Sequence, residues 1–216
     1  MTHTSGLGDY FDTAYNSTYQ TVYEDFDDFK EILKDAGTAF EPGSDWSYSN
    51  LGYLLLGFII QNITGDYYQY ITDHIFRKAD MANSGFWFFD EVLENAATSY
   101  YFDDKHKIWR SWVNPPLARG SSSGGGYATV GDLTKFIRAL FNSTLLQPSL
   151  VHEATTAKPQ LNSPHYGYGF FIGENEIRHS GNGTGTNAKL VHNKNGLTTV
   201  ILSNLSNGVA EIEKYL

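Results

Sequence analysis

The first half of the chain carries apolar residues at helical spacing. Such residues recur three and four positions apart in three segments, each expected to form a helix: residues 22–36, 51–63 and 67–77. Asn50 is the expected N-cap of the second helix, and Gly65 is expected to end it. The periodicity is poor between residues 80 and 126, where paired prolines and a glycine- and serine-rich run indicate loops.

The second half changes from helical to strand-like patterning. An amphipathic helix is expected from Val130, with Thr129 as its cap. Four later segments have the pattern of strands: residues 166–172, 176–179, 186–192 and 197–202. Their short separators require antiparallel hairpins, and a last helix is expected over residues 209–216. The layout is α+β, in a single domain over 1–216 that is mainly helical in 1–125 and combines a helix, antiparallel strands and a C-terminal helix in 126–216.

Composition and charge exclude several function classes. Lys and Arg number 15 against 24 Asp and Glu, and the resulting formal charge of −9 makes a nucleic acid backbone an unfavourable partner. The chain has no cysteine, which excludes disulfides, cysteine zinc sites and a cysteine nucleophile. The longest apolar run, residues 51–60, is too short for a membrane span, which takes about 20 residues. The first residues do not have the pattern of a signal peptide, and the cellular compartment stays open.

Metal and cofactor motifs are absent from the sequence, so neither a metal nor a cofactor is expected. It has no HExxH, no GxxxxGK, and no pair of histidines at helical ligand spacing. Residues 120–124 match the G-x-S-x-G pattern of α/β-hydrolases, and Ser122, Asp132 and His179 follow the chain order of that triad. The pattern needs a strand before it and a helix after it. Here two prolines precede it and further glycines follow, which favours a flexible loop.

Several blocks of sequence, in order along the chain, resemble the serine β-lactamase family, which includes class C β-lactamases, DD-peptidases and related esterases. Residues 40–65 contain Tyr48-Ser49-Asn50 and resemble the Tyr-x-Asn block of that family, and Thr2-His3-Thr4-Ser5-Gly6-Leu7 resembles its HTSGL stretch. The further blocks are residues 124–136, 166–170, 178–181 and 200–204. The resemblance implies a β-lactamase/transpeptidase-like fold, with an antiparallel sheet flanked by helices plus a helical region.

The resemblance implies a proton-transfer role for Tyr48. In this family a serine of a Ser-x-x-Lys pair attacks the acyl carbon, and the Tyr-x-Asn tyrosine helps to move the proton, since neighbouring cations favour its phenolate. Asn50 would hydrogen-bond the lysine or the substrate amide. The plainer alternatives are a tyrosine that packs at a helix start and an asparagine that caps the helix.

The third motif of the family, usually Lys-Thr-Gly, is His179-Ser180-Gly181 in this chain. A histidine is neutral more often than a lysine at neutral pH, which favours a peptidase, amidase or esterase over recognition of a β-lactam carboxylate. Ser180 and Gly181 would bind substrate, with Gly181 letting it lie against the strand edge. The backbone N–H of Asn182 would be one donor of the oxyanion hole. The alternative for His179 is an ordinary histidine near a strand end.

The Ser-x-x-Lys pair is missing, because no serine of the chain is followed by a lysine three residues later. The resemblance therefore implies a chain that lacks the N-terminal strands and nucleophile helix of the fold, and has no nucleophile of its own. Three hypotheses follow: a portion of a serine acyl hydrolase, inactive until the missing segment or a second copy completes it; a non-catalytic binding module that retains the cleft; or a hydrolase that uses Ser122. The expected substrate is a small acyl, peptide or β-lactam-like compound.

Overall fold

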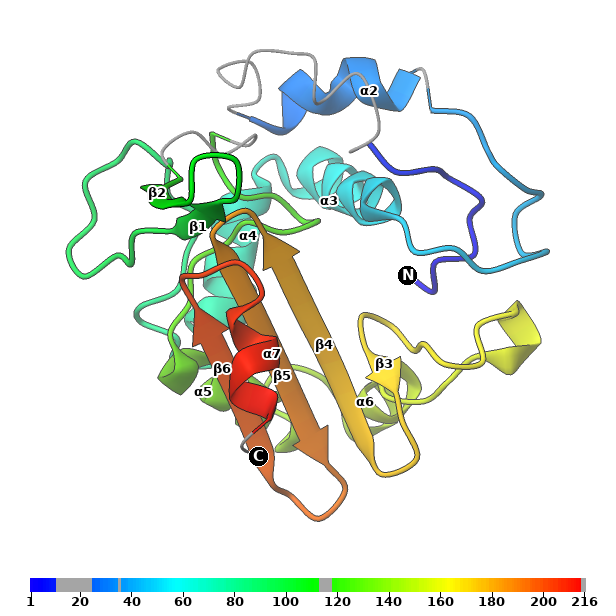
Figure 1. Cartoon of the computed structure of the whole chain (residues 1–216). Coiled ribbons are helices and arrows are strands. Elements are labelled where there is room, and N and C mark those ends of the chain that lie inside the picture. Colours follow the sequence, from blue (N-terminus) through cyan, green and yellow to red (C-terminus); the bar gives the residue numbers. More distant parts are fainter. Residues whose placement is uncertain (11–24, 35, 113–117, 215–216) are drawn as a thin grey trace.

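A four-stranded antiparallel sheet organises the second half of the molecule (Figure 1). The computed structural model describes residues 1–10, 25–34, 36–112 and 118–214. The strands run in the order β3 (Phe171–Ile172), β4 (Glu176–Gly183), β5 (Thr186–Asn193) and β6 (Thr198–Ser203). This is the antiparallel meander that the short separators predict. Figure 1 shows α7 (Gly208–Glu213) in front of the sheet and α5 (Val130–Phe141) behind it.

Two strands differ from their predicted extents. Of residues 166–172 only the last two form a strand, because the chain folds back through Gly169 at φ 89° and brings Tyr166 into a bridge with Phe171. β4 continues four residues past its predicted end to Gly183, since residues 180–183 keep pairing with β5 up to a tight turn. The sequence pattern misses this extension because Gly181 and Gly183 carry no apolar side chain to mark a strand.

The helices of the first half follow the predicted order. α3 (Asn50–Thr64) is followed by α4 (Tyr67–Ile71), which continues as the π-helix Thr72–Phe76. Of the helix predicted over 22–36, residues 22–24 and 35 lie outside the described residues, and the rest forms a 3₁₀ turn, Phe26–Phe29, and α2 (Lys30–Lys34). α5 begins as predicted, with the Thr129 hydroxyl accepting from the Asp132 backbone N–H at 3.1 Å.

Ser49, not Asn50, caps α3. The backbone of Ser49 is extended, and its hydroxyl accepts a hydrogen bond from the Gly52 N–H at 2.9 Å. Asn50 is already the first helical residue, so its side chain cannot serve as the cap. Gly65 ends the helix as predicted, at φ 86° with its N–H on the Gln61 carbonyl.

A hairpin and two short helices occur where the pattern predicted none. β1 (Tyr100–Asp103) pairs with β2 (Ile108–Ser111), and α6 (Pro148–Ala154) precedes a 3₁₀ turn, Pro159–Leu161. The hairpin depends on its turn, where the Asp103 carboxylate accepts from two backbone N–H groups and from Arg110. Such polar turn chemistry leaves no hydrophobic alternation in the sequence. The C-terminal helix α7 lies within its predicted range, of which residues 215–216 are outside the described residues.

The hydrophobic core of the helical region fixes the position of α3. One buried cluster joins α3 to its surroundings through Tyr10, Phe29, Leu51, Leu54, Phe58 and Tyr67, and a smaller cluster contains Ala79, Met81 and Ala139. Leu54 is fully buried. Among the described residues, no helix has the length and apolar character needed to cross a membrane. The start of α3 is thus packed against the N-terminal segment, the 3₁₀ turn Phe26–Phe29 and α4.

Gly185 provides a test of the close contact between the β4–β5 turn and the start of the β1–β2 hairpin. It has φ 75°, and a Cβ there would lie 2.8 Å from the Ser99 Cβ and 2.9 Å from the Tyr100 N. Gly196, in the β5–β6 turn, has φ 91° but open space around a Cβ. We expect Gly196→Ala to lower the free energy of unfolding by about 1 kcal/mol through backbone strain alone. Gly185→Ala should cost a further ~1–3 kcal/mol through overpacking.

Urea unfolding of the two variants and the native chain measures both losses. Equal losses for Gly185→Ala and Gly196→Ala would contradict the close approach of the hairpin to the β4–β5 turn.

Candidate functional site

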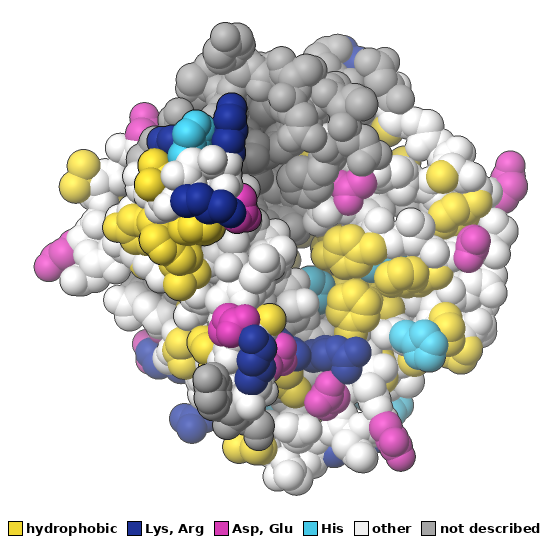
Figure 2. All heavy atoms as spheres, viewed as in Figure 1, with side chains coloured by type: hydrophobic (Ala, Val, Ile, Leu, Met, Phe, Trp, Pro, Cys, Tyr) yellow, Lys and Arg dark blue, Asp and Glu magenta, His cyan; other side chains and the backbone are white. Residues whose placement is uncertain are grey.

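Tyr48 and His179 come from distant parts of the chain and meet at the open side of β4. Tyr48 precedes the capped start of α3, and His179 lies on β4; their ring centroids are 6.3 Å apart. Phe171 lies parallel to the Tyr48 ring at 6.3 Å, and Trp46 lies next to Phe171. Figure 2 shows hydrophobic side chains gathered between β4 and the N-terminal segment. Tyr48 is 36% exposed, so its ring is accessible from solvent.

The phenol of Tyr48 is held protonated by its surroundings. Burial raises the pKa of Tyr48, and the negative charge of Asp9 raises it further. The family mechanism instead requires a cation beside this tyrosine. Within the described residues, no lysine or arginine side chain is hydrogen-bonded to Tyr48, so the electrostatics favour the phenol over the phenolate.

Asn50 is oriented by Asp9. Its side-chain Nδ2 donates to Asp9 Oδ2 at 2.8 Å, and its backbone N–H lies 3.4 Å from the same oxygen. An amide that donates through nitrogen keeps its carbonyl oxygen as an acceptor. In the part of the chain that the structure describes, no donor reaches that oxygen. Asn50 can therefore accept a hydrogen bond from an ammonium or amide N–H.

His179 is a neutral hydrogen-bonding group. Burial lowers its pKa below the ordinary value, and its Nε2 lies 3.1 Å from the Tyr166 hydroxyl. The Tyr53 hydroxyl, nearby in the same aromatic group, donates to the Met1 carbonyl at 2.9 Å. Which group donates in the Tyr166–His179 contact depends on which ring nitrogen of His179 carries the hydrogen.

The edge of β4 is open where substrate is expected. β3 pairs only with Ile177 and Arg178, so the residues that follow have no strand on that side in the described structure. Ser180, Gly181 and Asn182 are exposed, and a Cβ at Gly181 would meet nothing within 4 Å. An open strand edge presents backbone N–H and C=O groups to an extended ligand.

Five residues of this site carried no predicted role. Asp9, His3, Trp46, Tyr166 and Phe171 contact Tyr48, Asn50 or His179, or pack against side chains that do. His3, Tyr166 and their neighbours belong to blocks that resemble the family, which was the available signal. No sequence signal marked Asp9, because its role depends on a hydrogen bond with Asn50, which is 41 positions away in the sequence.

The alternative triad is wrong. The Ser122 hydroxyl donates to the Tyr53 carbonyl of α3 at 2.8 Å. The Asp132 carboxylate accepts from the Asn83 N–H and the Ser84 hydroxyl, at 2.7 and 2.9 Å. Ser122 thus bonds to the helix backbone, and Asp132 bonds to the loop before β1. Neither is hydrogen-bonded to His179, so the structure does not assemble a nucleophile elbow.

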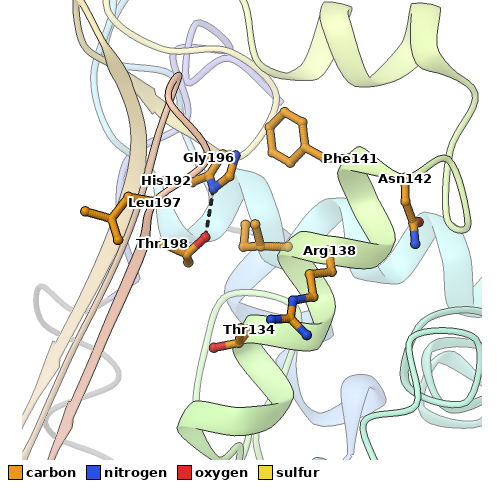
Figure 3. A pocket seen from close by; sticks show the side chains of 9 residues that line it. Thr134, Arg138, Phe141, Asn142, His192, Gly196, Leu197 and Thr198 are labelled. Carbon is orange, nitrogen blue, oxygen red and sulfur yellow. Dashed lines mark hydrogen bonds between the residues drawn. The ribbon is translucent and has the colours of Figure 1, made fainter.

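A separate hollow of about 570 Å³ lies between α5 and the β5–β6 turn (Figure 3). In Figure 3 the Phe141 ring lies beside the His192 ring, and His192 Nδ1 is hydrogen-bonded to the Thr198 hydroxyl at 2.8 Å. The other lining residues are Thr134, Ile137, Arg138, Asn142, Gly196 and Leu197. None of the predicted site residues lines it. Across the described residues, no group of three His, Cys, Asp or Glu could hold a metal ion.

Comparisons with known proteins show the family and the fold of this chain. The family model described as Beta-lactamase matches residues 1–215. The chain belongs to the beta-lactamase family. A curated relative, the putative penicillin-binding protein PbpX of Bacillus subtilis (strain 168), is 29% identical over 209 residues, which are 96% of this chain and 50% of that protein. The human serine beta-lactamase-like protein LACTB, mitochondrial, is 34% identical over 112 residues, 50% of this chain and 20% of its own.

Two solved structures have the same fold as this chain. The penicillin-binding protein from Bacillus halodurans has a TM-score of 0.86 and 25% identity, and the match covers 99% of this chain and 70% of that one. The D-amino acid amidase from Ochrobactrum anthropi SV3 has a TM-score of 0.71 at 20% identity, over 94% of this chain and 63% of that one. The β-lactamase/transpeptidase-like fold is thus confirmed. The chain spans about half the length of PbpX.

The charge of Asp9 provides a test of the electrostatics at Tyr48. Asp9→Asn keeps an oxygen that can accept from Asn50 but removes the negative charge. We expect the pKa of Tyr48 to fall, and to stay above the ordinary value because burial persists. NMR of the Tyr48 ring carbons across pH, over the range in which circular dichroism shows a folded chain, measures this shift.

Asp45→Asn is the matched control, because Asp45 is exposed and close to Tyr48 in sequence but does not act on its pKa. An unchanged or higher Tyr48 pKa in Asp9→Asn would contradict the assigned contact.

Proposed function

We propose that the chain supplies the substrate-binding part of a serine acyl hydrolase, and that it is inactive until a Ser-x-x-Lys segment completes the site. The observation that carries the proposal is the meeting of Tyr48 and His179 at the open edge of β4. In the described residues, no serine hydroxyl or lysine ammonium is hydrogen-bonded to either side chain. Tyr48 is also kept as a phenol, which is the state of a proton carrier that awaits its cation.

Each residue then has a chemical role. Once the lysine ammonium lies beside it, Tyr48 releases its proton to solvent and becomes the phenolate. The incoming serine oxygen then attacks the acyl carbon, and its proton passes to this phenolate. Asn50 Oδ1 accepts from that ammonium or from the substrate amide. The Asn182 N–H and the N–H of the serine stabilise the oxyanion. The leaving group takes up the proton, and water then hydrolyses the serine ester through the same groups. No metal or cofactor takes part in these steps.

The substrate is proposed to be an ester or an amide of a small acyl or peptide group. The family also includes enzymes of β-lactam-like substrates, which present a carboxylate. His179 stands where these have a lysine, and its lowered pKa leaves it neutral at pH 7. A neutral histidine gives weaker attraction to a carboxylate than an ammonium would.

Covalent labelling tests this function. The 216-residue chain alone should not react with a fluorophosphonate. Joined to the Ser-x-x-Lys segment of a family member, it should become labelled on the serine of that segment. Tyr48→Phe in the joined protein should slow labelling by about 10²–10⁴-fold, the usual contribution of a proton-transfer group. His165→Asn, which changes an exposed histidine, should label at the native rate.

Labelling of a serine within residues 1–216 would contradict the proposal. If the joined protein binds acyl amides reversibly but never reacts, the chain is instead a binding module that keeps the cleft.

A further inference from the structure

His3 holds the backbone on both sides of Tyr48. The Ser47 N–H donates to the His3 carbonyl at 3.0 Å, and the Ser49 N–H donates to the His3 imidazole Nδ1 at 3.1 Å. The imidazole also contacts the Tyr48 ring, with centroids 4.1 Å apart. One residue therefore binds the amide before Tyr48, the amide after it, and its side chain.

The backbone of His3 is itself in an uncommon conformation. Its φ is 59°, in the left-handed region that residues other than glycine seldom adopt. Such a conformation persists where the surrounding contacts determine it, and these cluster at functional sites. His3 is 4% exposed, and three other aromatic side chains enclose it, namely Trp46, Tyr53 and Tyr166.

The hydrogen bond from Ser49 fixes the tautomer of His3. An Nδ1 atom that accepts an N–H carries no hydrogen, so the hydrogen of the neutral ring is on Nε2. This Nε2 is buried without a hydrogen-bond partner in the described structure. Burial lowers the pKa of His3 to about 4, and the nearby Met1 amino group and His179 lower it too, whereas Asp9 raises it. The tyrosine hydroxyls of residues 48, 53 and 166 stay protonated in this range.

We infer that His3, as the neutral Nε2–H tautomer, is the positioning residue for Tyr48: its Nδ1 holds the Ser49 amide and thereby sets where the phenol stands. The catalytic value of placing the Tyr48 phenol rests on the proposed function. The contacts of His3 with Ser49 and Tyr48 can be tested without measuring turnover. Protonation of His3 places a hydrogen on Nδ1 and removes the acceptor. The Ser49 hydrogen bond and the Tyr48 ring position are then lost together as the pH falls through about 4.

Two substitutions separate the acceptor from the backbone conformation. Asparagine and glycine both tolerate a positive φ. The Asn side-chain oxygen can stand where Nδ1 does, whereas Gly offers no acceptor. His3→Asn should keep the native Ser49 and Tyr48 resonances at pH 7. His3→Gly should exchange the Ser49 amide hydrogen at least tenfold faster and shift the Tyr48 ring signals. The Ser47 amide, held by the backbone carbonyl, should change in neither.

NMR of the isotopically labelled 216-residue chain provides all these readouts. Long-range nitrogen–hydrogen correlation gives the His3 tautomer, and a titration from pH 7 to 3.5 follows Ser49 and Tyr48. The paired change near pH 4 should be present in the native chain and absent from His3→Asn. His165→Asn, at an exposed histidine, should titrate as the native chain does.

An Nδ1–H tautomer at neutral pH, a paired change that survives in His3→Asn, or Ser49 exchange in His3→Gly within twofold of native would each overturn the inference. If His3→Gly does not fold, the tautomer and the two titrations still decide. A failure of covalent labelling would count against the proposed function and leave these measurements unaffected.

Discussion

The positions of Tyr48 and Asn50 depend on the two hydrogen bonds made by the buried hydroxyl of Ser49. Its hydroxyl accepts from Gly52 and so starts α3, and it donates to the Gly8 carbonyl at 2.7 Å, which ties the N-terminal segment to the same helix. With Ser49 1% exposed, water cannot replace either bond, and an unmet hydrogen bond in such a place costs about 1–3 kcal/mol. The two hydrogen bonds of Ser49 therefore also fix the backbone of its neighbours, Tyr48 and Asn50.

Much of the fold could be predicted from the sequence because it depends on periodicity. α3 and α5 have apolar faces at helical spacing, and the meander has short separators, so local pattern and final structure agree. The hairpin β1–β2 could not be predicted, since its turn is stabilised by the carboxylate of Asp103 instead of by alternation. The cap of α3 was assigned one residue late because both Ser49 and Asn50 are residue types that favour a helix start.

The candidate site was predictable only as far as the family resemblance reached. Tyr48 and His179 were expected to act together, and the structure brings them together, while their roles in catalysis stay predictions. The contacts that set their chemistry involve Asp9 and Tyr166, which are 41 and 13 positions from their partners and follow from tertiary packing. Spacing along the chain carries no information on such pairs. The Ser122 pattern failed for the same reason, because its hydroxyl was already engaged by the helix backbone.

The open edge of β4 has a consequence for selectivity. Gly181 and Gly183 leave every second position of residues 180–183 without a side chain, so under the proposed function a ligand at this edge pairs chiefly through its main chain. Main-chain hydrogen bonds do not distinguish one ligand side chain from another. Under the proposed function, discrimination among ligands then falls to the neighbouring rings of Trp46, Tyr48 and Phe171, which favour shape and polarizability over charge.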